Sequence, residues 1–67
     1  MKLTQIEHLL TGYLALSRAS KGKQALVFLM METEAQKLEM CEFLSKNVNA
    51  TEARIMDEAK KIAAVSQ

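Results

Sequence analysis

The sequence has few of the residues that cross-link small proteins, bind metals or break helices and strands. Its 67 residues include one cysteine, one histidine, two glycines and no proline. Cys41 has no second cysteine to pair with, which excludes a disulfide scaffold. Zinc sites need about four Cys or His ligands, and His8 with Cys41 cannot supply them. Packing must therefore hold any fold, and we expect no metal or other cofactor.

Long apolar runs and an excess of charge of one sign are also missing. The net charge of +1 gives no overall attraction to nucleic acid or to an anionic membrane. The longest apolar run, Ala25–Met31, falls far short of the ~20 residues that cross a membrane. No apolar stretch of secretory-signal length follows Met1 and Lys2. We therefore expect a cytoplasmic protein that does not enter the membrane.

Apolar residues are well represented, at 49% of the chain, which excludes a disordered tail. A chain of this length still buries only ~60% of the surface that it exposes when unfolded. Apolar burial and the entropy of ordering then nearly cancel, so such domains usually need a staple or a partner. Because the sequence offers neither a disulfide nor a metal site, we expect a partner.

Residues 4–19 have the pattern of an amphipathic helix. Thr4 and Glu7 match a capping box at its start. Apolar residues follow at spacings of three and four, which place most of them on one face: Ile6, Leu9, Leu10, Tyr13, Leu14 and Leu16. We expect the helix to stop near Ala19, with Gly22 as the terminating residue.

Residues 23–46 predict a long central helix. Its beginning, Ala25–Met31, is apolar on every side, and strong helix formers continue from Glu32. Read by themselves, residues 26–31 also fit a buried strand. Leu and Met outnumber β-branched residues there, however, and the chain offers no second strand to pair with.

A third helix is expected over residues 51–65, with Asn49 or Thr51 as its cap. Arg54 and Glu58 stand four apart and predict an ion pair on its exposed face. The sequence therefore predicts an all-α fold. It is a single domain of three antiparallel helices with a long central helix.

The predicted central helix is longer than its neighbours can cover. It would span ~36 Å, against ~24 Å for each flanking helix. Its apolar beginning would then have one flanking helix, although a helix that is apolar all round is normally buried all round. We predict that this segment meets a second copy in a twofold homodimer, with another protein as the alternative partner. The predicted interface residues lie along it: Val27, Phe28, Met31, Ala35 and Leu38.

A basic turn precedes the central helix and contains Arg18, Lys21 and Lys23. These cations, with the amides at the start of the helix, could hold an anion or contact nucleic acid. The alternative is a solvated turn. The phosphate-loop motif is absent, because Gln24 stands where Ser or Thr is needed. A recognition helix also needs polar side chains at its beginning, whereas the predicted central helix begins with the apolar run Ala25–Met31. Nucleic-acid binding is therefore the second hypothesis.

No nucleophile, base and acid converge in the sequence. Helix neighbours point about 100° apart, so Glu7 and His8 do not face each other. Cys41 lies on an apolar stripe and reads as an inert packing residue; a reactive thiol would need a cation, for which Lys37 is the nearest choice. We predict no enzyme, but a small cytoplasmic interaction or regulatory module that homodimerises.

Overall fold

The computed structural model describes residues 2–65, and every regular element within them is an α-helix. The four helices are α1 (Leu3–Leu16), α2 (Lys21–Met30), α3 (Glu34–Lys46) and α4 (Glu52–Ala64). The predicted all-α class is confirmed. The predicted count of three helices is wrong, because the expected central helix is divided into α2 and α3.

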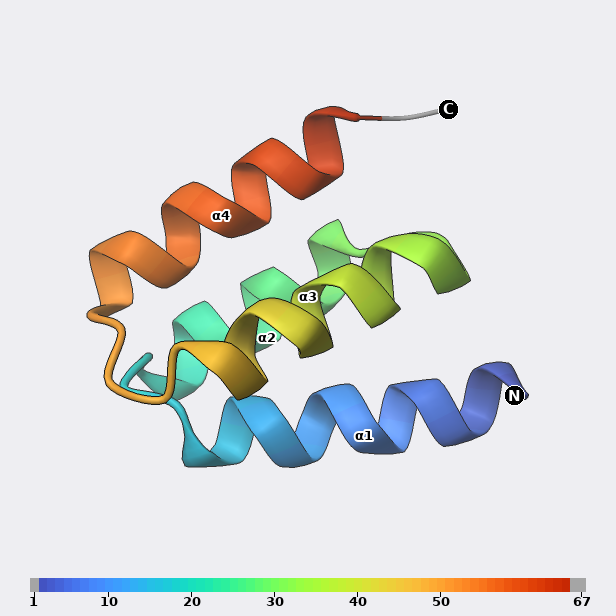
Figure 1. Ribbon diagram of the computed structural model, residues 1–67, viewed down its shortest axis with the longest axis horizontal. Coiled ribbons are helices and arrows are strands. Elements are labelled where there is room, and N and C mark those ends of the chain that lie inside the picture. Colours follow the sequence, from blue (N-terminus) through green and yellow to red (C-terminus); the bar gives the residue numbers. More distant parts are fainter. Residues whose placement is uncertain (1, 66–67) are drawn as a thin grey trace.

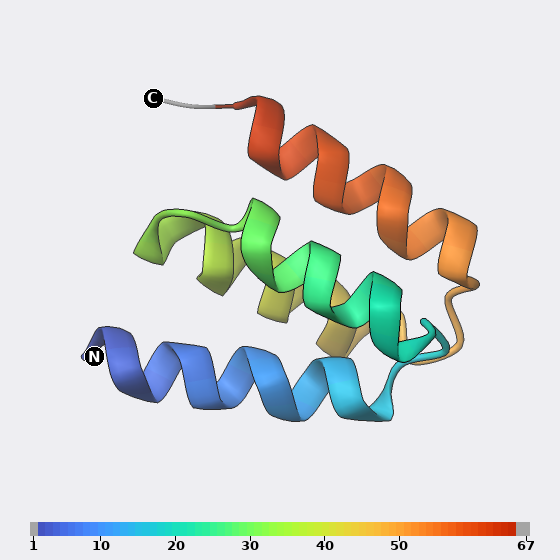
Figure 2. The ribbon, with the colours of Figure 1, turned by 180° about the vertical axis from the view of Figure 1, so that it is seen from behind.

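Successive helices run in opposite directions, and α2 and α3 form a middle layer between α1 and α4 (Figure 1). Both α1 and α4 pack against each of the two middle helices. The molecule measures 27 × 22 × 22 Å. Seen from behind, α2 lies in front of α3 with no other element drawn over it (Figure 2). One side of α2 therefore faces the core and the other faces outward.

The turn between α2 and α3 corrects the predicted helix over residues 23–46. The Thr33 hydroxyl accepts a hydrogen bond from the Gln36 amide at 3.1 Å. In return, the Gln36 side-chain oxygen accepts the backbone amides of Glu32 and Thr33 at 2.8 and 3.1 Å. This capping box satisfies amides that the start of a new helix would leave free. The chain therefore reverses at this point, although good helix formers lie on both sides.

The bounds of α1 also differ from the prediction. Thr4 lies inside the helix and is not its cap, because α1 begins at Leu3. The helix ends at Leu16, short of the predicted Ala19. Ser17 follows it, and its hydroxyl donates to a carbonyl of the last turn at 2.7 Å. Gly22, expected to terminate this helix, belongs to α2.

Hydroxyl caps begin both α2 and α4. Ser20 accepts an amide of the first turn of α2 at 3.4 Å, and Thr51 accepts the amide of Arg54 at 3.2 Å. Of the two predicted caps for the last helix, Thr51 is the one used and Asn49 is not. The predicted pair of Arg54 with Glu58 forms at 2.9 Å. The short connections thus place α4 antiparallel to α3, as predicted.

The core receives side chains from every helix and from the turn after α2. Its largest fully buried residues are Ile6, Leu10, Val27, Met31, Met40, Ile55 and Ile62. Within residues 2–65, no helix combines the length and the apolar character needed to cross a bilayer.

Candidate interaction surface

The outward side of α2 is apolar. Gly22, Ala25, Leu26 and Leu29 stand at positions i, i+3, i+4 and i+7, which form one stripe along a helix. All four are exposed, Leu29 at 75% and Leu26 at 43%. We call these residues the α2 outer face. A helix packed on one side normally carries polar residues on its outward side, so the apolar α2 outer face is a candidate binding surface.

A groove between α1 and α2 runs beside the α2 outer face. It is an open groove with a volume of about 580 Å³, bordered by Thr11, Leu14, Ala15, Lys21, Gln24, Ala25, Phe28 and Leu29. Lys21 is the one charged residue among these. Ala25 and Leu29 belong to both the groove and the face, so the two form a continuous apolar surface with a basic end.

The predicted interface residues do not lie together on this surface. Val27 is 0% and Met31 2% exposed, because both enter the core between α1, α3 and α4. Their burial removes the reason for assigning them to an interface. Phe28 is half-buried at the groove. Ala35 and Leu38 are exposed, but they lie on α3 beyond the turn.

Sequence reasoning missed Leu26 and Leu29 as the outward residues of this segment. The signal that could have found them is the stripe of small and apolar residues beginning at Gly22, once α2 is separated from α3. The Thr33–Gln36 capping box was the signal for that separation. Treating residues 25–31 as apolar all round hid the distinction between their inner and outer sides.

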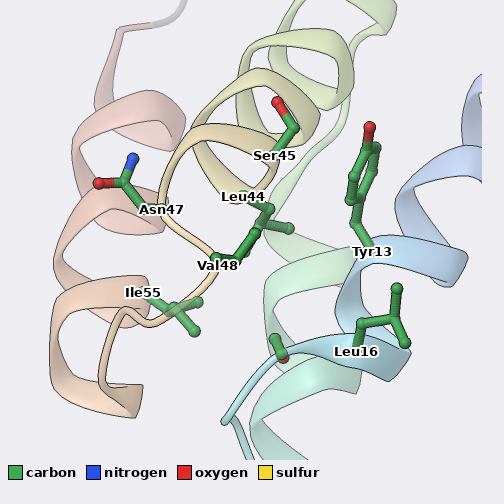
Figure 3. Close-up of a pocket in the computed structure, with 8 residues that line it drawn as sticks. Tyr13, Leu16, Leu44, Ser45, Asn47, Val48 and Ile55 are labelled. Carbon is green, nitrogen blue, oxygen red and sulfur yellow. The ribbon is translucent and has the colours of Figure 1, made fainter.

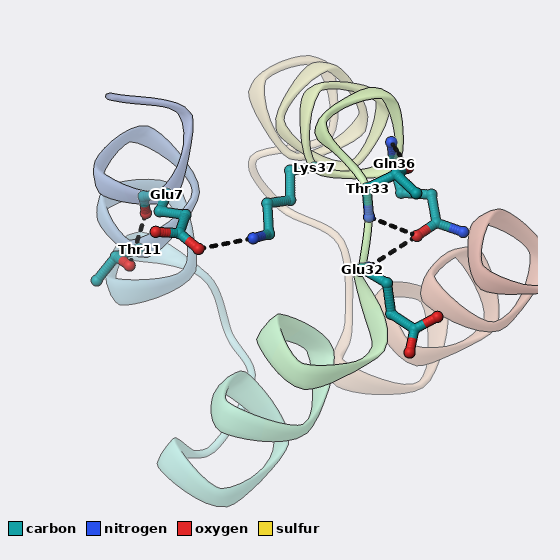
Figure 4. Close-up of polar contacts among 6 residues, drawn as sticks. All are labelled: Glu7, Thr11, Glu32, Thr33, Gln36 and Lys37. Carbon is teal, nitrogen blue, oxygen red and sulfur yellow. Dashed lines mark hydrogen bonds and ion pairs between the residues drawn. The ribbon is translucent and has the colours of Figure 1, made fainter. Parts of the chain in front are cut away.

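Phe28 packs beside a partly buried ion pair. Lys37 reaches from α3 to Glu7 on α1, with its Nζ 2.8 Å from a carboxylate oxygen (Figure 4). The Lys37 side chain is 6% exposed, and its Nζ lies 5.2 Å from the Phe28 ring centroid. The pair and the cation–π contact link α1, α2 and α3 next to the groove. These contacts connect the groove wall at Phe28 to α1 and α3, with Lys37 buried and Glu7 35% exposed.

The surroundings of Cys41 do not favour a reactive thiol. Cys41 is buried, and this burial raises the pKa of its thiol, which stays protonated at neutral pH. Lys37, the cation considered for activating it, is committed to Glu7. The environment of Cys41 is therefore that of a packing residue.

The basic turn already contains an anion of the chain itself. Arg18, Lys21 and Lys23 are exposed around the start of α2. The backbone amide of Ser20 donates to a carboxylate oxygen of Glu52, on α4, at 2.6 Å. This bond lowers the pKa of Glu52, with smaller contributions from the Ser20 side chain and Lys23. An external phosphate would have to compete with that carboxylate for the Ser20 amide.

A second, smaller pocket of about 220 Å³ lies at the opposite edge of α1 (Figure 3). Tyr13 and Leu16 come from α1 and face Leu44 and Val48 across it, while Ser45 adds a hydroxyl. No carboxylate, histidine or lysine is among the residues that line this pocket.

Other chemical groups are scattered over the surface. His8 is exposed on α1, and its neighbour Glu7 pairs with Lys37 instead. Among the described residues, no three His, Cys, Asp or Glu side chains gather closely enough to hold a metal ion. Comparisons with protein-family models, with curated proteins and with solved structures found no match to this chain.

Proposed function

We propose that this protein is a small interaction module that homodimerises through the α2 outer face and acts by binding, not by catalysis. One observation carries the proposal: Leu29 and Leu26 are 75% and 43% exposed on a single stripe of a helix whose other side is in the core. Contiguous exposed apolar surface beside a groove is typical of a site for another macromolecule.

The size of the chain supports the same proposal. A domain of 67 residues gains little net stability from its own core. Covering further apolar surface stabilises by ~25 cal/mol per Å², and a second copy would cover the stripe on both chains at once. Self-association therefore stabilises the fold as well as hiding the α2 outer face.

The interface in this proposal is shifted outward from the one that the sequence predicts. Ala25, Leu26 and Leu29 replace the buried Val27 and Met31 as its centre. Phe28 keeps a place at its edge, where the groove reaches it. Ala35 and Leu38 lie on another helix and are left out.

A cytoplasmic setting is part of the proposal. Cys41 is the one cysteine in the sequence, and it is a buried, free thiol. Proteins of reducing compartments keep such thiols, whereas small domains of oxidising compartments usually pair several cysteines.

The proposal is tested by sedimentation equilibrium at micromolar concentration. We expect the wild-type chain to sediment with twice its mass of 7.5 kDa. Leu29→Glu should sediment as a monomer with an unchanged helical circular dichroism spectrum, because Leu29 is outside the core. The matched control is Val48→Glu, which alters another exposed apolar residue, 69% exposed in the α3–α4 loop. A wild-type monomer, or a Leu29→Glu dimer as stable as the Val48→Glu dimer, would overturn the proposal.

Nucleic-acid binding through Arg18, Lys21 and Lys23 is the competing hypothesis. The exposure of these residues suits phosphate contacts, but Glu52 places a negative charge among them. A gel shift at low salt decides: binding that is lost in Lys21→Glu with Lys23→Glu would favour this function over self-association. We expect no shift.

A further inference from the structure

The charges at the two ends of α2 are the reverse of what its helix dipole favours. Lys21 and Lys23 lie in the first turn, where there is no acidic residue, and the last turn has no basic residue. Glu32 follows just beyond the end of the helix. Helix N-termini favour nearby negative charge and C-termini favour nearby positive charge. On the α2 outer face, neither end of α2 has a side chain of the favoured charge. Glu52 compensates in part from the α4 side.

The charge pattern of α2 is complementary to that of a second α2 that runs in the opposite direction. Leu26 lies near the middle of the apolar stripe, with Lys21 five residues before it and Glu32 six residues after it. Lys21 is the first residue of α2 and Glu32 lies two residues beyond its last residue, so the two charges stand at opposite ends of the stripe. A twofold axis through the middle would exchange the two ends. It would place a lysine of each chain opposite a glutamate of the other.

We propose that a second copy of this chain docks on the α2 outer face with the two α2 helices antiparallel, so that Lys21 of each copy faces Glu32 of the other. This orientation rests on the proposed homodimer and adds its geometry. It brings acidic residues to both helix N-termini and basic residues to both C-termini. It also brings Leu29 of each chain toward the first helical turn of the other α2, which contains Gly22 and has open space at that position.

A parallel arrangement would have the opposite electrostatics. It would bring the two Lys21 residues together at one end and the two Glu32 residues together at the other. Like charges placed opposite each other at an interface oppose association. The distribution of charge along α2 therefore selects the antiparallel second copy over a parallel one.

Charge reversal tests the orientation, read by sedimentation equilibrium at low ionic strength, where exposed charges are weakly screened. Lys21→Glu and Glu32→Lys, made separately, should each weaken the dimer by about tenfold, because each creates two like-charge contacts per dimer. The chain with both reversals should recover affinity close to that of the wild type. Lys60→Glu, on the exposed surface of α4, is the control and should leave the dimer unchanged.

The outcomes separate this inference from the proposed homodimer. A wild-type chain that stays monomeric would overturn both. If Leu29→Glu dissociates the dimer but the doubly reversed chain is as weak as the single variants, the homodimer stands and the antiparallel orientation is wrong. Single reversals that bind as tightly as the wild type would also overturn the orientation. Circular dichroism of each variant confirms that the chain is folded.

Discussion

Two helices of this small protein, α2 and α4, pack on the same core but present opposite chemistry to the outside. The exposed side of α4 is mostly charged, with Arg54, Asp57, Lys60 and Lys61. That of α2 carries Leu26 and Leu29. On their inner sides α2 buries Val27 and α4 buries Ile55, Met56, Ala59 and Ile62, and the two helices also pack against each other. The difference is that α4 presents charge to the solvent, whereas α2 leaves an apolar stripe exposed, which we propose that a second copy covers.

The largest predicted effect separates an inner from an outer residue. Ile55→Ala removes a side chain of α4 that is 1% exposed and should lower the free energy of unfolding by about 2–5 kcal/mol. Leu29→Ala should change the stability of the monomer by less than ~0.5 kcal/mol, because Leu29 touches little within its own chain. Urea unfolding at the lowest usable protein concentration measures both. Similar losses in the two variants would contradict the division into inner and outer sides.

Next in size is the ion pair behind Phe28, which fixes α2 on the inner side. Glu7→Gln leaves the buried ammonium of Lys37 without its carboxylate and should cost about 1–3 kcal/mol. Lys37→Met removes the buried charge and keeps a long, flexible side chain. Its effect on the free energy of unfolding should therefore be near neutral or stabilising. Thermal unfolding at neutral pH compares them. If Lys37→Met were as damaging as Glu7→Gln, the pair would be contributing attraction and not merely compensating a buried charge.

A smaller effect is expected at the turn that separates α2 from α3. Thr33→Ala removes the hydroxyl that accepts the Gln36 amide at 3.1 Å and should cost about 1 kcal/mol. Thr33→Ser keeps the hydroxyl and serves as the control. Denaturant unfolding measures the change. A cost shared equally by Thr33→Ser would show that the methyl group, not the cap, matters here.

The smallest effect concerns pH and the bond that ties α4 to the start of α2. The pKa of Glu52 is lowered in the folded chain, chiefly by the Ser20 amide. A lowered pKa stabilises the fold above the unfolded value of 4.5, and this contribution disappears as pH falls through the folded value. Glu52→Gln should therefore be less stable than the wild type at neutral pH, with a difference that shrinks below pH 4.5. A difference that is constant with pH would refute this linkage.

The sequence predicted much of the fold but not its division at residue 31. The 3.6-residue spacing of apolar residues set the helical class and the position of the last helix, because local pattern and burial agree there. Thr33 and Gln36 were overlooked because the residues around them are strong helix formers. A reciprocal cap of that kind ends a helix when tertiary packing also stabilises the reversed chain. That packing cannot be read from the sequence.

The candidate surface was located in the right segment but on its inner side. Val27 and Met31 were assigned to a partner on the premise that the chain had too few helices to cover them. Once α3 is a separate helix, the protein has the helix it needed, and both side chains enter the core. Leu26 and Leu29 could not be told from them by composition, since only the direction of the core distinguishes the two sides.

The central claim, that the α2 outer face is covered by a second copy, is tested most directly by the concentration dependence of the thermal midpoint. Association of folded chains makes Tm rise with protein concentration, whereas unfolding of a monomer does not depend on it. Over about a hundredfold range of concentration, we expect the Tm of the wild type to rise and that of Leu29→Glu to stay constant. A wild-type Tm that does not change with concentration would contradict the account.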